Sequence, residues 1–507
     1  MGKPRLPNQK KAYKELSKRL AGYMMRVRNI YDRLNEKAAM LVESVGYDGL
    51  TEFSFDDYPE IEREVKLLLS QFVRELQTLI YSGTSSEWKS SNTFQDTVAN
   101  KALKYYRAQV HGDRFKHYYR DNGDQLKDFL HRKENGLDLS SKLWNQSGNY
   151  KESLEATIST AIEKGMSATA LSKKLSRYLN DWPSLQADYQ EKYGKATNIH
   201  DCEYRSLRLA RNEISMAYRS AEQARWQQFD FILGYKIKLS DSHPRYDICD
   251  DLAGDYPKDF KFRGWHPNCL CYTVPIVMSE DEYWSDNREN SPNKITAPPK
   301  NFGEWVDKSE NLERIGKANG KGTLPYWLRD NAKIKDCSVL MSKARTYGDA
   351  IQKQAETIAR KYNGTVTPIN YKSFSSMYRK LNSEKDMLVS DIKDSVRNTI
   401  VVEKENIDSV VKELQSLPTF DRYKSQTPEK FCGYSGNIIN LKMPNGIQAE
   451  IQVNTPKMIY AKETEANARK ILGDKVWEQI AKETGMQGGL GHKYYEEIRI
   501  LDEVKDR

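Results

Sequence analysis

Residues 205–224 read RSLRLARNEISMAYRSAEQA, and this stretch decides how the N-terminal half of the chain is organised. Its apolar side chains recur every three or four residues, at Leu207, Ala210, Ile214, Ala217, Ala221 and Ala224. That spacing predicts a helix with one narrow stripe of small side chains, which favours close helix packing. We expect Gly234 to end the helix. A half-buried strand should follow, because apolar and lysine side chains alternate over residues 235–239.

A group of cysteine and histidine residues follows this strand and closes with the string HPNCLC at residues 266–271. Thiolates and imidazole are good zinc ligands, and a closed structural site needs four ligands. The sequence supplies that number with Cys249, His266, Cys269 and Cys271. Other residues could replace one of these ligands, namely Asp247, Cys202 and His243. The alternative is that the cysteines only fill a core and that His266-Pro267 is a turn.

These motifs carry a first resemblance. The helix with Ala-Arg-Asn-Glu at residues 210–213, the strand and turn after it, and the closing HPNCLC resemble the Mu F-like head-morphogenesis domain of tailed phages. The resemblance covers residues 139–278 and implies a small α+β domain in a minor head protein. It also implies portal and capsid proteins as partners, and a place inside the virion after synthesis in the bacterial host cytoplasm.

The composition sets broad limits on the remainder. A chain of 507 residues suggests about three domains. The formal net charge of +9 favours DNA or acidic partners, although the excess is small for this length. We find no apolar run near 18 residues and no signal-peptide pattern, so we expect no membrane contact. The scattered cysteines indicate free thiols or metal ligands and not a disulfide framework.

Helical periodicity dominates the chain before residue 205. It predicts helices over residues 10–35, 61–81 and 96–119, and two shorter helices on either side of Gly165, the second capped by Ser167. Tyr105-Tyr106-Arg107 and Tyr118-Tyr119-Arg120 mix aromatic and basic side chains, which indicates either helix packing or nucleic-acid contact. We expect a helical region over residues 1–138. The polar, Pro- and Gly-punctuated residues 279–335 are expected to be a linker.

The C-terminal module opens with a predicted helix over residues 343–361. A strand is predicted at residues 399–402, and Asn445-Gly446 between two alternating runs predicts a hairpin of residues 438–443 and 447–453. Side-chain parity in the second hairpin strand places Gln448, Glu450 and Gln452 on one face. A polar face with a carboxylate indicates either a site or the exposed outer face of an antiparallel sheet.

Four motifs in series carry a second resemblance. They are KSFSSMYRK from Lys372, Asp391 and Asp394 with Arg397, GYSGN at residues 433–437, and EIQVNT at residues 450–455 with Glu463. Together they resemble the synthetase domain of RelA/SpoT-like enzymes over residues 336–507. The resemblance implies an α+β, nucleotidyltransferase-like fold with a mixed sheet. It implies transfer of pyrophosphate from ATP to the 3′-hydroxyl of GTP or GDP, or of another acceptor such as a tRNA end.

This resemblance also implies a role for each matching residue. The nucleotide-binding residues would be Lys372, Ser376, Arg379, Lys380, Arg397 and Tyr434, with the tyrosine stacked on the acceptor base. Glu450 would orient or deprotonate the attacking hydroxyl, with Gln452 beside it. Either Asp394 or Asp391 would hold Mg²⁺ through hard oxygen ligands.

The sequence departs from the family pattern at several positions. Asn370 and Asn454 stand where arginines are common, and the histidine expected after Tyr434 is absent. These departures leave open a divergent enzyme, an altered acceptor or an inactive domain. His200-Asp201 is a lone pair, so no hydrolase domain is expected. Residues 488–493 are interpreted as a loop, although a phosphate-binding role for His492 or Lys493 is an alternative.

The sequence therefore predicts a multidomain chain, mainly α in its N-terminal half, with a Mu F-like α+β domain and a C-terminal α+β synthetase domain. The predicted function is a phage minor head protein that carries a toxin or effector enzyme. The first alternative is a purely structural virion protein with an inactive C-terminal domain. A DNA-binding packaging factor is a third interpretation, based only on the net charge.

Overall fold

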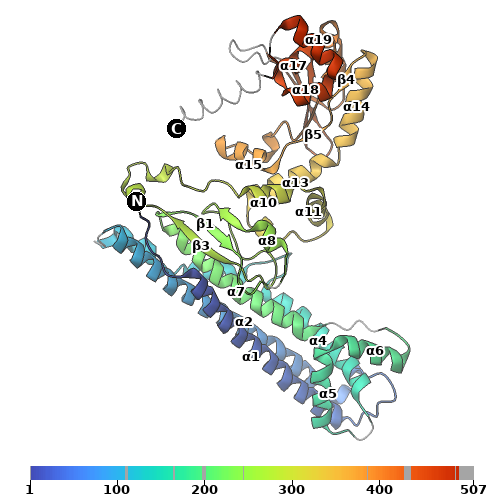
Figure 1. Ribbon diagram of the computed structural model, residues 1–507. Coiled ribbons are helices and arrows are strands. Elements are labelled where there is room, and N and C mark those ends of the chain that lie inside the picture. Colours follow the sequence, from blue (N-terminus) through green and yellow to red (C-terminus); the bar gives the residue numbers. More distant parts are fainter. Residues whose placement is uncertain are drawn as a thin grey trace. The chain divides into compact units, whose positions relative to one another are not determined.

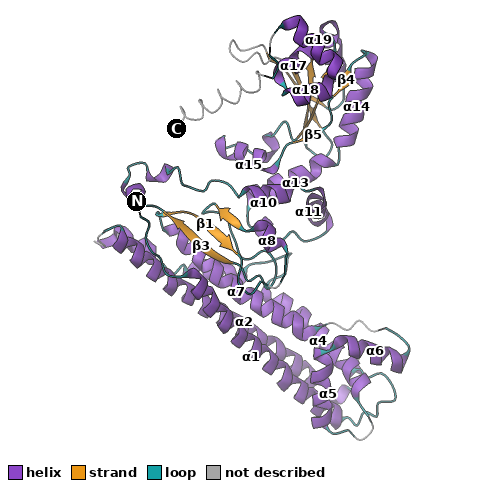
Figure 2. Cartoon of the chain, in the orientation of Figure 1, coloured by secondary structure: helices purple, strands orange, loops and turns teal. Residues whose placement is uncertain are grey.

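The computed structural model describes residues 2–108, 112–163, 166–196, 201–243, 245–384, 386–426, 436–485 and 487–489 (Figures 1 and 2). The chain forms two compact units. The N-terminal unit is Met1–Pro298 with Pro325–Trp327, and the C-terminal unit is Pro299–Leu324 with Leu328–Arg507. Helices predominate in the described part of the chain (Figure 2). None of the described helices is apolar enough over a sufficient length to cross a membrane.

The N-terminal unit is built from long helices and one small sheet. Its helices are α1 (Gln9–Ser44), α2 (Glu62–Tyr105), α3 (Gly123–His131), α4 (Leu139–Ala161), α5 (Ala168–Asn180), α6 (Trp182–Tyr193), α7 (Cys202–Gln228), α8 (Ile248–Leu252), α9 (Glu280–Trp284) and α12 (Tyr326–Arg329), the last shared with the other unit. Its strands are β1 (Ile232–Lys238), β2 (Gly254–Tyr256) and β3 (Tyr272–Val277), in the antiparallel order β2-β1-β3.

Helix α7 is the centre of this unit and packs on both α1 and α2. Residues 213–219 are all buried, so this part of the helix is buried on every face. The sequence predicted only one narrow buried stripe. The predicted helix at 96–119 is only partly confirmed, because α2 ends at Tyr105 and Gly112–Tyr119 form a separate 3₁₀ helix. Its first part is joined to the predicted helix at 61–81 in the continuous α2, although Ser, Gly and Thr are frequent in the stretch between them. Packing explains this, since a Cβ at Gly83 would lie 2.6 Å from Ile214 Cδ1. Small residues there let the two helices approach closely, which outweighs their weak helix propensity.

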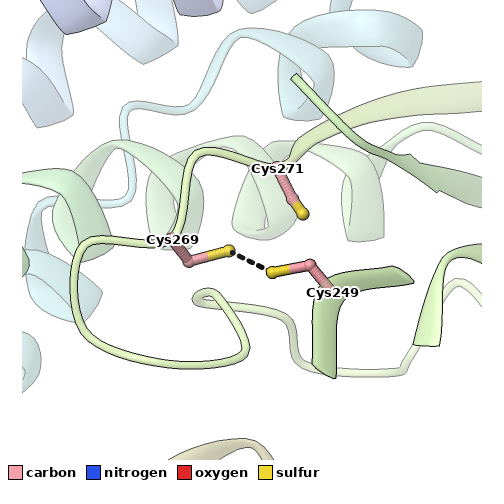
Figure 3. A group of neighbouring side chains, drawn as sticks. All are labelled: Cys249, Cys269 and Cys271. Carbon is pink, nitrogen blue, oxygen red and sulfur yellow. Dashed lines mark hydrogen bonds between the residues drawn. The ribbon is translucent and has the colours of Figure 1, made fainter. Parts of the chain in front are cut away.

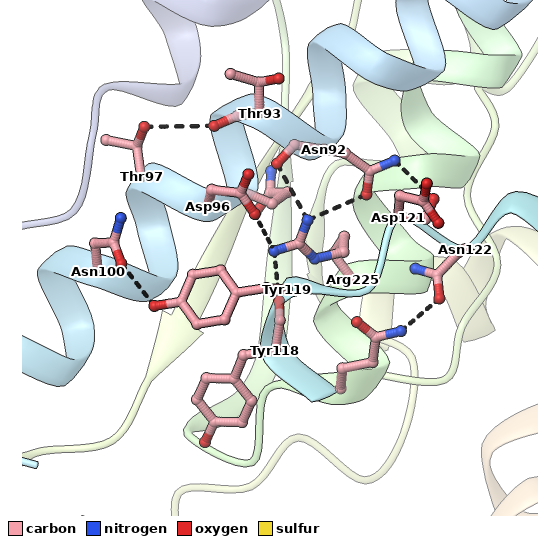
Figure 4. A network of polar contacts seen from close by, with 12 residues as sticks. Asn92, Thr93, Asp96, Thr97, Asn100, Tyr118, Tyr119, Asp121, Asn122 and Arg225 are labelled. Atoms are coloured by element: carbon pink, nitrogen blue, oxygen red, sulfur yellow. Dashed lines mark hydrogen bonds and ion pairs between the residues drawn. The ribbon is translucent and has the colours of Figure 1, made fainter. Parts of the chain in front are cut away.

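A buried arginine of α7 forms hydrogen bonds to α2 (Figure 4). Arg225 donates to the Asn92 carbonyl at 3.2 Å, to Asp96 Oδ1 at 2.6 Å and to the Tyr118 carbonyl. Tyr118 is itself fully buried, as is Tyr106, which stacks on Tyr283 at 4.1 Å. Of the two readings of the Tyr–Arg stretches, the structure favours packing for these two tyrosines, because a core ring cannot stack on a base.

The helix ends earlier than expected, and Gly234 has another role. Helix α7 stops at Gln228, and Gly234 lies within β1. A Cβ at Gly234 would lie 2.7 Å from the Tyr256 carbonyl oxygen of β2. The glycine is therefore required by close backbone approach in the sheet and not by a helix end. The predicted alternation of residues 235–239 is confirmed for residues 235–238 of the strand.

The C-terminal unit is an α+β domain with a mixed sheet. Its further helices are α10 (Lys300–Asp307), α11 (Ser309–Lys321), α13 (Ala332–Arg345), α14 (Gly348–Lys361), α15 (Phe374–Ser383), α16 (Ile407–Gln415), α17 (Pro456–Lys462), α18 (Glu465–Leu472) and α19 (Asp474–Thr484). Its strands are β4 (Thr365–Val366), β5 (Asn370–Tyr371), β6 (Val396–Val401), β7 (Phe420–Gln426), β8 (Gly436–Lys442) and β9 (Gln448–Asn454). They follow the order β4-β6-β9-β8-β7, with β5 also paired to β6.

The predicted hairpin is confirmed as β8 and β9, which pair antiparallel around Gly446 at a φ of +83°. Strand β9 also pairs parallel to β6, so it lies in the interior of the sheet. Helices α14 and α16 pack against the sheet, and Gln352 of α14 receives a hydrogen bond from Asn398 of β6. Because Asn398 alternates with Arg397, helix α14 covers the face opposite to Arg397.

The structure differs from the expectation for residues 279–335. The expected linker contains α9 to α12 and the start of α13, and it contributes to both units. These helices have only 4 to 13 residues, so each shows its helical period over few turns. Trp305 and Trp327 of this segment are buried. Near the C-terminus Gly473, with a φ of +80°, separates α18 from α19.

Candidate active site

A polar cavity of about 1010 Å³ lies against one face of the C-terminal sheet. Strands β5, β6, β8 and β9 line it, together with α15 and the end of α17 and start of α18. Its charged lining residues are Arg345, Lys380, Lys393, Asp394, Arg397, Glu450, Lys462, Glu463 and Lys470. The cavity therefore combines a few carboxylates with an excess of cations.

The strand register places the predicted catalytic face in this cavity. Arg397 of β6 pairs with Glu450 of β9, and Thr399 pairs with Gln452. Paired residues of neighbouring strands point to the same side of a sheet. The polar face of residues 448–452 is thus enclosed, with Gln452 only 6% exposed, and it is not the outer face of a sheet.

A chain of hydrogen bonds orients the Glu450 carboxylate. Gln452 Nε2 donates to Glu450 Oε1 at 2.7 Å, and Lys462 Nζ donates to Gln452 Oε1 at 2.8 Å. Burial raises the pKa of Glu450, the hydrogen bond from Gln452 opposes the shift, and the charge of Asp394 adds to it. Burial also lowers the pKa of Lys462. A carboxylate with a raised pKa and a fixed orientation is suited to accept a proton.

The pKa of the second carboxylate of the cavity is shifted in the opposite direction. Asp394 Oδ2 accepts from Lys372 Nζ at 2.5 Å. Burial alone would raise the pKa of Asp394, but Lys372, together with Lys380 and Arg397, holds that pKa below its usual value. The environments of Glu450 and Asp394 thus push their pKa values apart, which is typical of two carboxylates with different tasks.

The structure separates the two candidate magnesium ligands. Asp394 lines the cavity, whereas Asp391 is exposed and accepts a hydrogen bond from the Leu388 N–H at 2.9 Å. Oδ1 of Asp394 is buried and has no hydrogen-bond partner among the described residues. Of the two candidate aspartates, Asp394 is therefore the one whose carboxylate lies in the cavity lining.

The predicted nucleotide-binding residues divide into three groups. Lys380 and Arg397 line the cavity. Lys372 does not line it, but it donates a hydrogen bond to Asp394, which does. Ser376 is bonded to Ser373 at the start of α15, and Arg379 is exposed and not part of the lining. Tyr434 lies outside the described residues.

Sequence reasoning missed several groups of this site. Lys462 was not singled out, although it follows the motif strand closely and is the donor to Gln452. Arg345, Lys393 and Lys470 also line the cavity. In the sequence each of them is only a basic residue on a helix or loop, and basic residues are equally expected on a solvent-exposed surface. Asn370, where an arginine was expected, lies in the lining too.

Three of the four predicted zinc ligands, Cys249, Cys269 and Cys271, converge in the N-terminal unit (Figure 3). The Sγ atoms of Cys249, Cys269 and Cys271 lie within 4.8 Å of one another. His266 Nε2 lies 3.1 Å from Cys249 Sγ. Cys202, a candidate replacement, instead contacts Ser153 at 3.3 Å. His243 Nε2 is bonded to Asp250 at 2.8 Å.

Comparison with known proteins links the chain to one kind of enzyme. No family model matches the chain. The (p)ppApp synthetase toxin Tas1 of Pseudomonas aeruginosa (strain UCBPP-PA14) is 37% identical over 164 residues, which are 31% of this chain and 37% of that protein. The crystal structure of the complex between the Type VI effector Tas1 and its immunity protein is matched at 36% identity, covering 33% of this chain and 85% of the other, with a TM-score of 0.30. The chain thus matches just over a third of the curated relative's length.

Proposed function

We propose that the C-terminal unit transfers the pyrophosphate group of ATP to the 3′-hydroxyl of a nucleotide acceptor. The observation that carries the proposal is the pair Glu450 and Asp394 in one cationic cavity, with their pKa values displaced in opposite directions. The similarity to a (p)ppApp synthetase supports the same reaction type.

In the proposed reaction Glu450 receives the proton of the acceptor 3′-hydroxyl. The oxygen then forms a bond to the β-phosphorus of ATP, the bond from that phosphorus to the α–β bridging oxygen breaks, and AMP leaves. Gln452 and Lys462 hold Glu450 in position through their hydrogen bonds. The protein forms no covalent bond, so positioning and charge stabilisation supply the rate.

The cationic lining suits the triphosphate. Lys380 and Arg397 have no side-chain hydrogen bond or ion pair to any residue that the structure describes, and both face the cavity. Charge-assisted hydrogen bonds to phosphate oxygens would satisfy them. Lys372 is instead the partner of Asp394, and its place in the proposal is to keep that carboxylate ionised.

The donor set at Asp394 fits Mg²⁺. The ion prefers hard oxygen ligands and usually takes one or two carboxylates together with substrate phosphates. Asp394 offers the unpartnered Oδ1, and Glu450 interacts with it electrostatically across the cavity. When bound, Mg²⁺ would neutralise phosphate charge. Arg397 and Lys380 would share that task.

The acceptor and the biological role are part of the proposal. The relative is named for (p)ppApp, whose base is adenine, so adenine nucleotides are the first acceptors to test, before GTP, GDP and tRNA. The relative is also named a toxin and a Type VI effector with an immunity protein. By the same similarity we propose that this chain acts as a toxin, and that a protein which blocks the cavity would act as its antidote.

The experiment combines the purified full chain, Mg²⁺ and [γ-³²P]ATP with each acceptor in turn, and identifies products by mass spectrometry. We expect a pyrophosphorylated nucleotide and AMP in equal amounts. Glu450→Gln should lower the rate about 10²–10⁴-fold, the range for a lost general base. Glu356→Gln, on α14 away from the cavity, is the matched control and should leave the rate unchanged.

The proposal is wrong if no acceptor yields product while the chain is folded. Equal growth inhibition by the wild-type chain and Glu450→Gln in cells would contradict the toxin role. These results would favour the alternative of an inactive C-terminal domain.

For the N-terminal unit we propose the role of a phage head component that binds portal and capsid proteins. The support is the first resemblance, whose pieces form one substructure here. Arg219 of α7 donates to the carbonyls of Cys269 and Cys271 within the HPNCLC string, at 2.8 and 3.0 Å. Cosedimentation of the full chain with particles tests this role. Particles of normal composition that exclude the chain would contradict it.

A further inference from the structure

The geometry points to a metal centre in the N-terminal unit, separate from the proposed transferase. We propose that Cys249, His266, Cys269 and Cys271 bind one Zn²⁺ ion in a closed tetrahedral site. The ion would have a structural role, because four protein ligands leave no position open for substrate.

The sulfur atoms already stand at ligand spacing. Cys249 Sγ and Cys269 Sγ are 3.7 Å apart. Two thiolates at about 2.3 Å from a tetrahedral zinc ion are about 3.8 Å apart. The thiol side chains point toward a common centre, from α8 on one side and from the segment before β3 on the other (Figure 3). All three cysteines are at most 5% exposed, and none forms a disulfide.

The imidazole is oriented as a ligand. His266 Nδ1 lies 2.7 Å from the Pro267 carbonyl oxygen. That contact requires Nδ1 to carry the proton, so Nε2 presents its lone pair to the cysteine group. Metal-bound histidines are commonly fixed in this way by a hydrogen bond from the other ring nitrogen.

Simple packing of thiols explains the arrangement less well. Nε2 of His266 lies 3.1 Å from Cys249 Sγ and 3.3 Å from Asp247 Oδ2. In the metal-free chain a proton on Nε2 would pair the imidazolium with this carboxylate. Packing gives no reason for three buried thiols to converge beside the imidazole, whereas a cation bound among them does. Asp247 already accepts from the Cys249 N–H at 2.7 Å, which suits a capping role for it outside the ligand set.

The surroundings balance the charge of the proposed centre. Zinc with three thiolates and a neutral imidazole carries one negative charge, and burying an uncompensated charge is costly. The Arg219 side chain is 4% exposed and donates to the carbonyls of Cys269, Cys271 and Arg263. Its guanidinium therefore bonds to both cysteines of the Cys-x-Cys loop and supplies the compensating positive charge.

The ion would join parts of the chain that little else connects. Cys249 follows β1, and the other three ligands come shortly before β3. The sheet between them is small, since β2 has three residues. Cross-linking α8 to the HPNCLC loop would fix the loop-rich end of this sheet.

The test is metal analysis of the full chain after reconstitution with Zn²⁺ alone under reducing conditions. We expect about one zinc ion per chain, and less than about 0.1 in the double variant Cys269→Ser/Cys271→Ser. Cys202→Ser and Cys337→Ser change buried cysteines elsewhere and should keep about one ion. Substitution by Co²⁺ should give the intense visible bands of a tetrahedral ion, with thiolate charge-transfer bands in the near ultraviolet.

Three results would overturn the proposal. They are a wild-type chain that binds no stoichiometric zinc, an octahedral Co²⁺ spectrum, and equal zinc loss in Cys202→Ser and Cys269→Ser. The fourth ligand is tested separately. His266→Ala should weaken zinc binding and Asp247→Asn should not, and the reverse result would contradict the assignment of His266. Because the spectrum of the wild-type chain needs no variant, misfolding of a variant does not obscure the outcome. Transferase activity is a separate readout.

Discussion

Two arginines, one in each unit, occupy opposite environments. Arg225 in the N-terminal unit is 1% exposed, and it donates to Asn92, Asp96 and Tyr118. Arg397 in the C-terminal unit is exposed and lines the cavity, and its side chain has no hydrogen bond or ion pair to a described residue. An arginine whose terminal amino groups both donate to acceptors of its own chain, as those of Arg225 do, stabilises the fold. One that faces a cavity with open donors is available to a ligand.

The same difference applies to the groups around each arginine. Around Arg225 the guanidinium donates to acceptors on Asn92, Asp96 and Tyr118, and the Asp96 carboxylate compensates its charge. Around Arg397 the described lining holds further cations, Lys380, Lys393, Lys462 and Lys470. Such like charges repel one another, and a polyanion relieves that repulsion. The comparison therefore assigns the N-terminal network to stability, and it is the physical basis for the phosphate binding that we propose in the C-terminal cavity.

The largest expected effect is the difference in unfolding free energy between variants of the two arginines. Arg225→Ala should destabilise the N-terminal unit by about 3–5 kcal/mol, because a buried charged network loses its centre. Arg397→Ala should leave the unfolding free energy nearly unchanged and raise the KM for ATP about tenfold. Urea unfolding and steady-state kinetics of both variants measure these effects. The comparison fails if Arg397→Ala unfolds the chain or leaves KM unchanged.

A pair of aspartates sharpens the comparison within the C-terminal unit. Asp394→Asn should lower the transfer rate about 10²-fold and raise the Mg²⁺ concentration that it needs, because the cavity loses its ionised oxygen ligand. Asp391→Asn is the matched control and should have little effect, since Asp391 is exposed and caps a turn. Rates measured over a Mg²⁺ titration give the answer. Greater loss in Asp391→Asn would reassign the ligand.

The smallest effect concerns pH and the N-terminal unit. Burial raises the pKa of Glu222 to about 7, although Thr273 and Tyr13 donate to its carboxylate. Its folded pKa lies above the unfolded value near 4.5, so the stability it contributes is fully present below about pH 4.5 and is lost as the pH rises through 7.

Between pH 5 and 7 the unfolding free energy should therefore fall by roughly 2 kcal/mol through this group. Glu222→Gln should abolish that decline, and the exposed Glu60→Gln should preserve it. Urea unfolding at each pH is the measurement. An unchanged pH profile in Glu222→Gln would show that another group titrates.

Local patterns in the sequence predicted much of the fold. The alternation at residues 235–238, the Asn445-Gly446 hairpin and the Ser167 helix cap are all present. These features depend on neighbouring residues, whose side-chain period and turn preferences can be read directly. The continuity of α2 could not be read in this way, because Gly83 is tolerated in that helix only through its contact with α7.

The sequence by itself determined which side chains are candidates for chemistry, namely Glu450 on the polar face of a strand, and three cysteines and a histidine within residues 249–271. Only the tertiary structure placed Asp394, and not Asp391, in the cavity and brought Lys462 to Gln452. The reason is physical. Side-chain type and strand parity are local properties, whereas burial, pKa and hydrogen-bond partners depend on segments that meet only when the sheet and its helices have packed.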